Sequence, residues 1–142
     1  MRYLDRLQPL ALLVMRIALG AVMIGHGSQK VFGGMQNHVH MVSSLGLPGW
    51  MAYLSAGAEF FGGILVIVGL LTRFAALAIL INMSVAIWKV HWKSGLLGQG
   101  GYQFPLALAA IAFALIFFGA GPVALDSIRR GVGSGWSGRA KK

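Results

Sequence analysis

The sequence predicts an all-α integral membrane protein, an antiparallel bundle of four transmembrane helices. Hydrophobic residues make up 57% of the 142 residues, and charged residues only 11%. A soluble domain normally carries about 25% charged residues, so this chain lacks the polar surface that water requires. Four apolar runs are each close to the roughly 20 residues that a spanning helix needs. The length suits one domain, which we place at residues 1–126.

Short polar or glycine-rich segments separate the four apolar runs. Pro9 lies at the start of the first run, where the first turn of a helix tolerates proline. Only Thr72 and Arg73 separate the second run from the third, which predicts a tight antiparallel hairpin. The predicted spans cover residues 10–32, 50–71, 74–92 and 104–121.

The first connection, residues 33–49, is long enough to hold a further element. Its valine and leucine residues fall near helical spacing before a Gly-Leu-Pro sequence, which predicts a short interfacial helix. His38 and His40 lie in this connection two residues apart and share a helix face poorly. We therefore assign both histidines to the surface.

Basic residues are distributed unequally between the two ends of such a bundle. Three lie on the side of the long connections, and eight lie on the side of both termini: Arg2, Arg6, Arg73, Arg129, Arg130, Arg139, Lys141 and Lys142. The positive-inside rule then places both termini in the cytoplasm. The predicted location is the bacterial cytoplasmic (inner) membrane, with residues 127–142 as a basic, flexible cytoplasmic tail.

Composition also excludes several classes of function. The net charge of +9 comes from residues that flank apolar runs, so it fits lipid headgroups and not nucleic acid, for which the chain has no recognition helix or aromatic platform. The absence of cysteine excludes disulfides, thiolate metal ligands and iron–sulfur ligation by this chain.

Glu59 is a carboxylate near the middle of the second apolar run, where a charge is costly unless it is paired, neutralised or hydrated. Arg16 lies about two helical turns inside the first run. Because the two helices are antiparallel, the residues are expected at similar depth, which predicts an Arg16–Glu59 ion pair. This pair either fixes helix register or belongs to a functional site.

Further polar residues gather at the outer end of the predicted bundle. His26 and Lys30 share a face of the first helix, and the third ends with Trp88 and His91. Gln103 opens the fourth span. Each has a simple structural explanation: a bonded histidine, a snorkelling lysine or an aromatic belt. The functional interpretation is an outward-facing pocket, with Glu59 and His26 as reactive groups and Lys30, Trp88, His91 and Gln103 as binding groups.

These residues lie in segments that resemble the DoxX family of small bacterial membrane proteins. The resemblance rests on Arg16, LGAVMIGHGSQKVFGG, GAEFFGGILVIVGLLTR and GAGPVALD, and it extends over about residues 15–126. It implies a four-helix membrane bundle, an association with redox work at the membrane, and polar positions at Arg16, His26, Lys30, Glu59 and Arg73. Many relatives carry a glutamate where this chain has Gln103, so a role that needs two carboxylates is in doubt.

Two functions follow as hypotheses. The first is a redox-associated membrane subunit that binds quinone or a similar lipophile, suggested by the family. The second is a non-catalytic assembly subunit of a membrane complex. The expected partners are the lipid bilayer and either other membrane subunits or further copies of the chain. His26 and His91 have the residue type for a bis-histidine haem, but no motif supports haem, and we assign no metal site.

Overall fold

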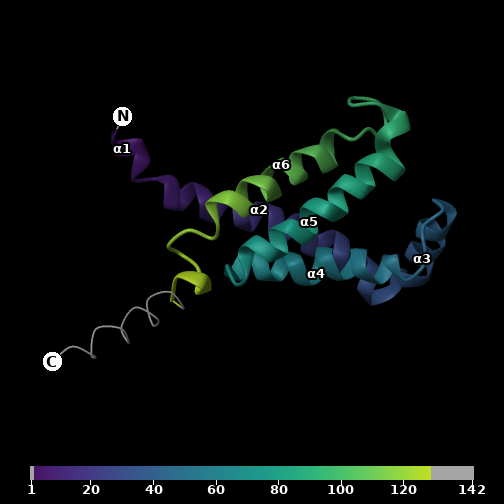
Figure 1. The fold of residues 1–142 in the computed structure, drawn as a ribbon, viewed down its shortest axis with the longest axis horizontal. Helices are drawn as coiled ribbons and strands as arrows, with labels where there is room; N and C mark the ends of the chain where they lie inside the picture. Colours follow the sequence, from purple (N-terminus) through teal and green to yellow (C-terminus); the bar gives the residue numbers. More distant parts are fainter. Residues whose placement is uncertain (1, 129–142) are drawn as a thin grey trace.

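The computed structural model describes residues 2–128, and every regular element in them is a helix (Figure 1). The predicted tail, residues 127–142, lies outside the described part except for Ser127 and Ile128, which end a helical turn over residues 125–128. The elements are α1 (Arg2–Asp5), α2 (Gln8–Gln29), the π-helical turn η1 (Lys30–Gly34), α3 (Met35–Ser44), α4 (Met51–Val68), α5 (Thr72–Ala86), the π-helical turn η2 (Ile87–His91), the 3₁₀ turn η3 (Trp92–Ser94) and α6 (Gln103–Phe118).

Three helical stretches in the described residues are long and apolar enough to cross a membrane: Gln8–Ser44, Met51–Val68 and Thr72–Ser94. The helix α6 is equally apolar in character but shorter, at 16 residues. Large apolar side chains such as Phe74, Phe113 and Phe117 are exposed, as expected for a surface that meets lipid. The predicted all-helical membrane class is therefore confirmed, with α6 shorter than the sequence predicts.

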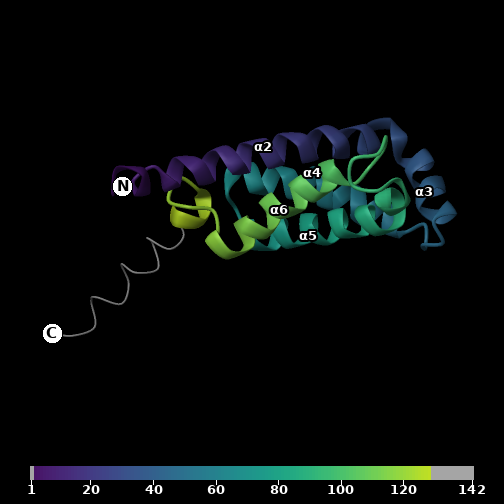
Figure 2. The ribbon, with the colours of Figure 1, turned by 90° about the horizontal axis from the view of Figure 1, so that it is seen from above.

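The four longer helices pack against one another in chain order. The helix α2 packs along α4, α4 along α5, α5 along α6, and α6 also touches α2. Figure 2 shows that the start of α2, the α4–α5 turn and the described C-terminal segment lie at one end. The helix α3 and the α5–α6 connection lie at the other end (Figures 1 and 2). The helix predicted in the first connection is thus present as α3.

The predicted tight hairpin between the second and third long helices is present, but its turn is at Gly69–Leu71, and Thr72 and Arg73 already belong to α5. Gly69 and Leu71 have positive φ values of 72° and 49°, so the chain reverses within a few residues. The Asp126 carboxylate accepts hydrogen bonds from the backbone N–H groups of Leu71 (2.9 Å) and Thr72 (3.1 Å). These N–H groups lie at the start of α5, where backbone donors have no partner within the helix. Asp126, in the segment after α6, supplies the missing acceptors.

The helices α2 and α4 approach so closely that glycine is required at their contact. A Cβ atom on Gly20 would lie 2.7 Å from the carbonyl oxygen of Gly63, and one on Gly63 would lie 2.9 Å from that of Gly20. Further along, a Cβ on Gly27 would lie 2.5 Å from the backbone nitrogen of Phe60. Close backbone approach at small residues is the usual way in which membrane helices gain packing contacts.

The predicted Arg16–Glu59 ion pair is wrong. The Arg16 side chain is only 1% exposed, and its guanidinium donates four hydrogen bonds of 2.5–2.9 Å to backbone carbonyls: those of Val66, Ile67, Ala120 and Val123. Val66 lies seven residues beyond Glu59, about 10 Å along the helix axis. Arg16 therefore binds the C-terminal end of α4, whose last carbonyls lack partners within the helix, and ties it to the segment after α6.

Candidate functional site

A pocket of about 1080 Å³ lies between the α2, α3 and α4 side of the molecule and the α5 and α6 side. In Figure 1 the α5–α6 pair and the α2–α4 pair diverge toward the end that carries α3. The wall is mostly apolar, with side chains such as Met23, Val42, Leu54, Ile81 and Leu108. A concave, mainly apolar site with a few convergent polar groups is typical of small-molecule binding.

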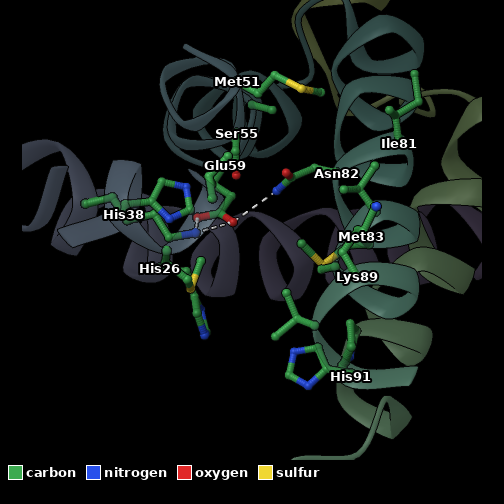
Figure 3. A pocket seen from close by; sticks show the side chains of 18 of the residues that line it. His26, His38, Met51, Ser55, Glu59, Ile81, Asn82, Met83, Lys89 and His91 are labelled. Carbon is green, nitrogen blue, oxygen red and sulfur yellow. Dashed lines mark hydrogen bonds and ion pairs between the residues drawn. The ribbon is translucent and has the colours of Figure 1, made fainter. Parts of the chain in front are cut away.

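The polar centre of this pocket is an ion pair between Lys30 and Glu59. The Lys30 Nζ atom lies 2.7 Å from Oε1 and 2.6 Å from Oε2 of Glu59. Asn82 Nδ2 donates a third hydrogen bond to Oε1 at 3.0 Å, as Figure 3 shows. The Glu59 side chain is therefore satisfied although the residue is only 4% exposed. Three elements, η1, α4 and α5, meet at this carboxylate.

Lys30 still has an unused hydrogen-bond donor, whereas the Glu59 carboxylate already accepts three hydrogen bonds. An ammonium group carries three N–H donors, and two of those of Lys30 point to Glu59. One Lys30 hydrogen therefore remains for an acceptor on a ligand. The Glu59 carboxylate already accepts three hydrogen bonds, so in this arrangement the centre offers a donor more readily than an acceptor.

His38 also lines the pocket, and its assignment to the surface was wrong. The residue is only 7% exposed, and its Nε2 atom is buried without a hydrogen-bond partner. Burying an unpaired polar group of this kind costs about 1–3 kcal/mol. The reason for the error is the chain turn in η1, where Gly33 is not helical, so that α3 packs back against α4. His40, in contrast, remains exposed.

Three of the predicted pocket residues lie around the pocket without touching the ion pair. His26 is exposed, its Nδ1 lies 3.0 Å from the Val22 carbonyl oxygen, and its ring centroid is 5.8 Å from that of Phe104. His91 Nδ1 lies 2.7 Å from the Gly100 carbonyl oxygen. Each contact fits a ring whose Nδ1–H donates, which leaves Nε2 as an acceptor. The third, Gln103, is an exposed wall residue.

Trp88 is not among the residues that line the pocket, so the pocket geometry offers no contact for its predicted binding role. It is 67% exposed, and the Lys89 Nζ atom lies 4.5 Å from its ring centroid. Three other residues of the same turn, Lys89, Val90 and His91, do line the pocket. Because η2 is a π-helical turn, the side chains that follow α5 are rotated relative to a continuous α-helix.

From the sequence we predicted no pocket role for His38, Asn82 or Lys89. Of these three residues, only Asn82 could have been recognised from the sequence, because a side-chain amide in the middle of an apolar run needs a hydrogen-bond partner. Nothing in the local sequence marks His38, because its burial depends on how α3 returns toward α4.

Comparison of the sequence with known proteins identifies the family of this chain. The sequence model of the DoxX family matches residues 11–92, which include Lys30, Glu59 and Asn82. The chain belongs to the DoxX family. A relative in Bacillus subtilis (strain 168), named "Putative oxidoreductase CatD", is 35% identical over 103 residues, covering 72% of this chain and 76% of the relative.

Two uncharacterised proteins of Haemophilus influenzae are also similar to this DoxX-family chain. One is 32% identical over 136 residues, covering 89% of this chain and 96% of the relative. The other is 38% identical over 77 residues, covering 54% of this chain and 51% of the relative. No solved structure matches the chain.

Proposed function

We propose that this DoxX-family protein is a redox-associated subunit of the bacterial inner membrane that binds quinone or a similar lipophile in the pocket around Lys30 and Glu59. The observation that carries the proposal is the ion pair, which stands in the wall of a mostly apolar pocket of about 1080 Å³. Ligand pockets usually have volumes of about 300–1,000 Å³, so a quinone ring with the first part of its tail would fit.

The pocket residues would bind such a ligand by hydrogen bonds and exchange protons with it. A quinone carbonyl is a hydrogen-bond acceptor, and the remaining N–H of Lys30 is a donor beside the pocket. Glu59 and His26 are the groups that we propose exchange protons with the ligand, while His91 and Gln103 contribute to binding. In this role a reduced partner subunit would supply the electrons. The relative named as an oxidoreductase supports this association.

The proposal includes a topology in which α2, α4, α5 and α6 all cross the membrane and both termini are cytoplasmic. The sequence count supports it: eight basic residues belong to the side of the termini and the α4–α5 turn and three to the other side, with five of the eight lying outside the described residues. The chain is free of cysteine, so single cysteines can be labelled selectively. His40→Cys should react with an impermeant maleimide on intact cells, whereas Arg6→Cys should react only after permeabilisation. The opposite pattern would reverse the topology.

Quinone binding can be measured directly on the purified protein in lipid nanodiscs. Decylubiquinone should quench tryptophan fluorescence saturably in the wild type. Glu59→Gln and His26→Ala should reduce redox activity in the native complex while leaving the amount of folded protein unchanged. Wild-type protein that shows no saturable binding would contradict the proposal. Mass spectrometry of protein from native membranes would identify bound lipophiles and partner subunits.

A non-catalytic assembly role is the second candidate, and one observation favours it. Lys30, Glu59 and Asn82 join three helical elements through one carboxylate, which is also what an architectural contact would do. Under this alternative the Glu59→Gln variant lowers the yield of the complex, and the activity per assembled complex stays unchanged.

A further inference from the structure

His38 is a buried polar side chain that the proposed binding reaction does not yet use. It comes from α3, which packs against η1 and α4, the elements that carry Lys30 and Glu59. Figure 3 shows its ring beside the Glu59 carboxylate, and the charges of both Lys30 and Glu59 act on it. Its Nε2 atom has no hydrogen-bond partner in this arrangement.

A purely structural role does not explain a histidine ring at this position. A buried polar atom without a partner lowers stability, whereas an apolar side chain of similar size would fill the same space without that cost. An unpaired polar atom in the wall of a candidate binding pocket points to a second conformation of the pocket, in which that atom makes a hydrogen bond. The neighbouring groups show which arrangement is available.

Glu59 depends on Lys30, and a ligand would compete for Lys30. A ligand oxygen first binds the third Lys30 hydrogen, and closer contact with the ammonium group then draws it away from the carboxylate. A buried carboxylate that loses its cation is strongly unfavourable unless another donor replaces it. Asn82 donates to Oε1 and not to Oε2, so the position that Lys30 vacates on Oε2 is left open. His38 is the adjacent side chain with an unused ring nitrogen.

We propose that His38 is a positioning residue whose Nε2–H takes the place of Lys30 on Glu59 when Lys30 turns to an acceptor oxygen of a bound lipophile. The ligand class is a membrane-soluble molecule whose head carries a carbonyl or carboxylate oxygen. This inference rests on the proposed function, because it assumes a ligand in the pocket. It adds a step in which His38 replaces Lys30 as the hydrogen-bond donor to Glu59, so that the Lys30 ammonium group can move to the ligand.

The exchange predicts an unusual combination of effects at position 38. His38→Leu removes the donor and also removes the unpaired polar atom. We expect it to weaken decylubiquinone binding about tenfold, which corresponds to about 1.4 kcal/mol. In the absence of ligand its thermal stability should equal or exceed that of the wild type. His38→Gln retains an N–H donor and should bind within about threefold of the wild type.

The matched control is His40→Leu, two residues away on the same helix but exposed. It should leave both binding and stability unchanged. All four proteins are compared in nanodiscs by tryptophan quenching with decylubiquinone and by thermal unfolding without it. Weaker binding by His38→Leu, restored in His38→Gln, with undiminished ligand-free stability would support the exchange.

The other outcomes overturn it in distinguishable ways. If the wild type binds and His38→Leu binds equally well, the partner exchange is wrong and the proposed function stands. If His38→Leu is unstable or unfolded, or His38→Gln does not restore binding, His38 is an ordinary packing residue. If the wild type itself does not bind decylubiquinone, the proposed function and the inference fail together.

Discussion

Lys30 and Glu59, 29 positions apart in the chain, form an ion pair in which one ammonium nitrogen lies 2.6 and 2.7 Å from the two carboxylate oxygens. The pair joins the start of η1, directly after the end of α2, to the middle of α4. It resolves the cost of an acid in an apolar helix, and it leaves one N–H of Lys30, a residue that lines the pocket, without a partner in the pair. The proposed binding site and a stabilising contact therefore share the same two side chains.

Removing only the cation of this pair should strongly destabilise the protein. Lys30→Met leaves the buried Glu59 without its partner, and we expect a loss of about 3–5 kcal/mol in the free energy of unfolding. The double variant Lys30→Met/Glu59→Leu should recover most of that loss, because no charge remains to be paired. Unfolding in detergent micelles, followed by circular dichroism, measures both. The exposed Lys93 provides the control Lys93→Met, with an expected change within about 0.5 kcal/mol.

Equal losses in the single and double variants would contradict this prediction. Such a result would mean that the two side chains act through packing and not through their charges.

The guanidinium group of Arg16 should not be replaceable by lysine. Its donors reach four carbonyls on two segments, and a lysine cannot reproduce that fork. We expect Arg16→Lys to lower stability by at least about 2 kcal/mol, since hydrogen bonds from charged groups contribute about 1.5–3 kcal/mol each. The same micelle unfolding assay applies. Arg73→Lys is the control, because exposed Arg73 donates one 3.3 Å bond to Phe117.

If Arg16→Lys and Arg73→Lys were equally mild, Arg16 would not hold the two segments together.

The contact between α2 and α4 should not accept a methyl group. Gly63→Ala places Cβ 2.9 Å from the Gly20 carbonyl oxygen and 3.0 Å from the backbone nitrogen of Ile24, so backbone must move. Overpacking of this kind costs about 1–3 kcal/mol. Gly25→Ala is a matched control on α2, since its Cβ would meet no atom within 4 Å. Thermal unfolding should separate the two variants, and equal midpoints would argue against close helix packing.

A side chain added at Gly57 should block the pocket without disturbing the fold. Gly57 lines the pocket, and a Cβ there meets no atom within 4 Å. Gly57→Leu should therefore weaken decylubiquinone binding about tenfold or more by occupying ligand space, while the unfolding temperature stays close to that of the wild type. Gly25→Leu, which also adds a side chain into open space but away from the pocket wall, should bind normally.

Equal binding by Gly57→Leu and the wild type would place the ligand elsewhere.

Much of the fold was predictable because lipid imposes simple rules on sequence. Apolar runs of sufficient length indicated the positions of the long helices, and the Thr72–Arg73 step indicated the hairpin between α4 and α5. The length of α6 was not predictable: helix α6 ends at Phe118, and Gly119 follows with a positive φ of 75°. The apolar character of the run continues past the point where the backbone leaves the helix.

The candidate site was predictable in its residue types but not in its pairings. Glu59 required a partner wherever it lay, because an isolated charge is too costly in an apolar run. Depth along antiparallel helices favoured Arg16, yet the rotation of α2 and the turn at η1 direct Lys30 to the acid instead. Long basic side chains reach several positions, so sequence spacing alone did not choose between them.

The sequence by itself determined that this is a helical membrane protein of the DoxX type with one acid that must be paired. The helical membrane class and the need to pair the acid follow from composition and apolar run length, which act locally. The DoxX type rests instead on the resemblance of the motifs around Arg16, His26 and Glu59. Only the tertiary structure decided that Lys30 pairs with Glu59, that Arg16 joins α4 to the segment after α6, and that His38 is buried. Those outcomes depend on helix rotation and on the return of α3 toward α4, which are set by packing between distant segments.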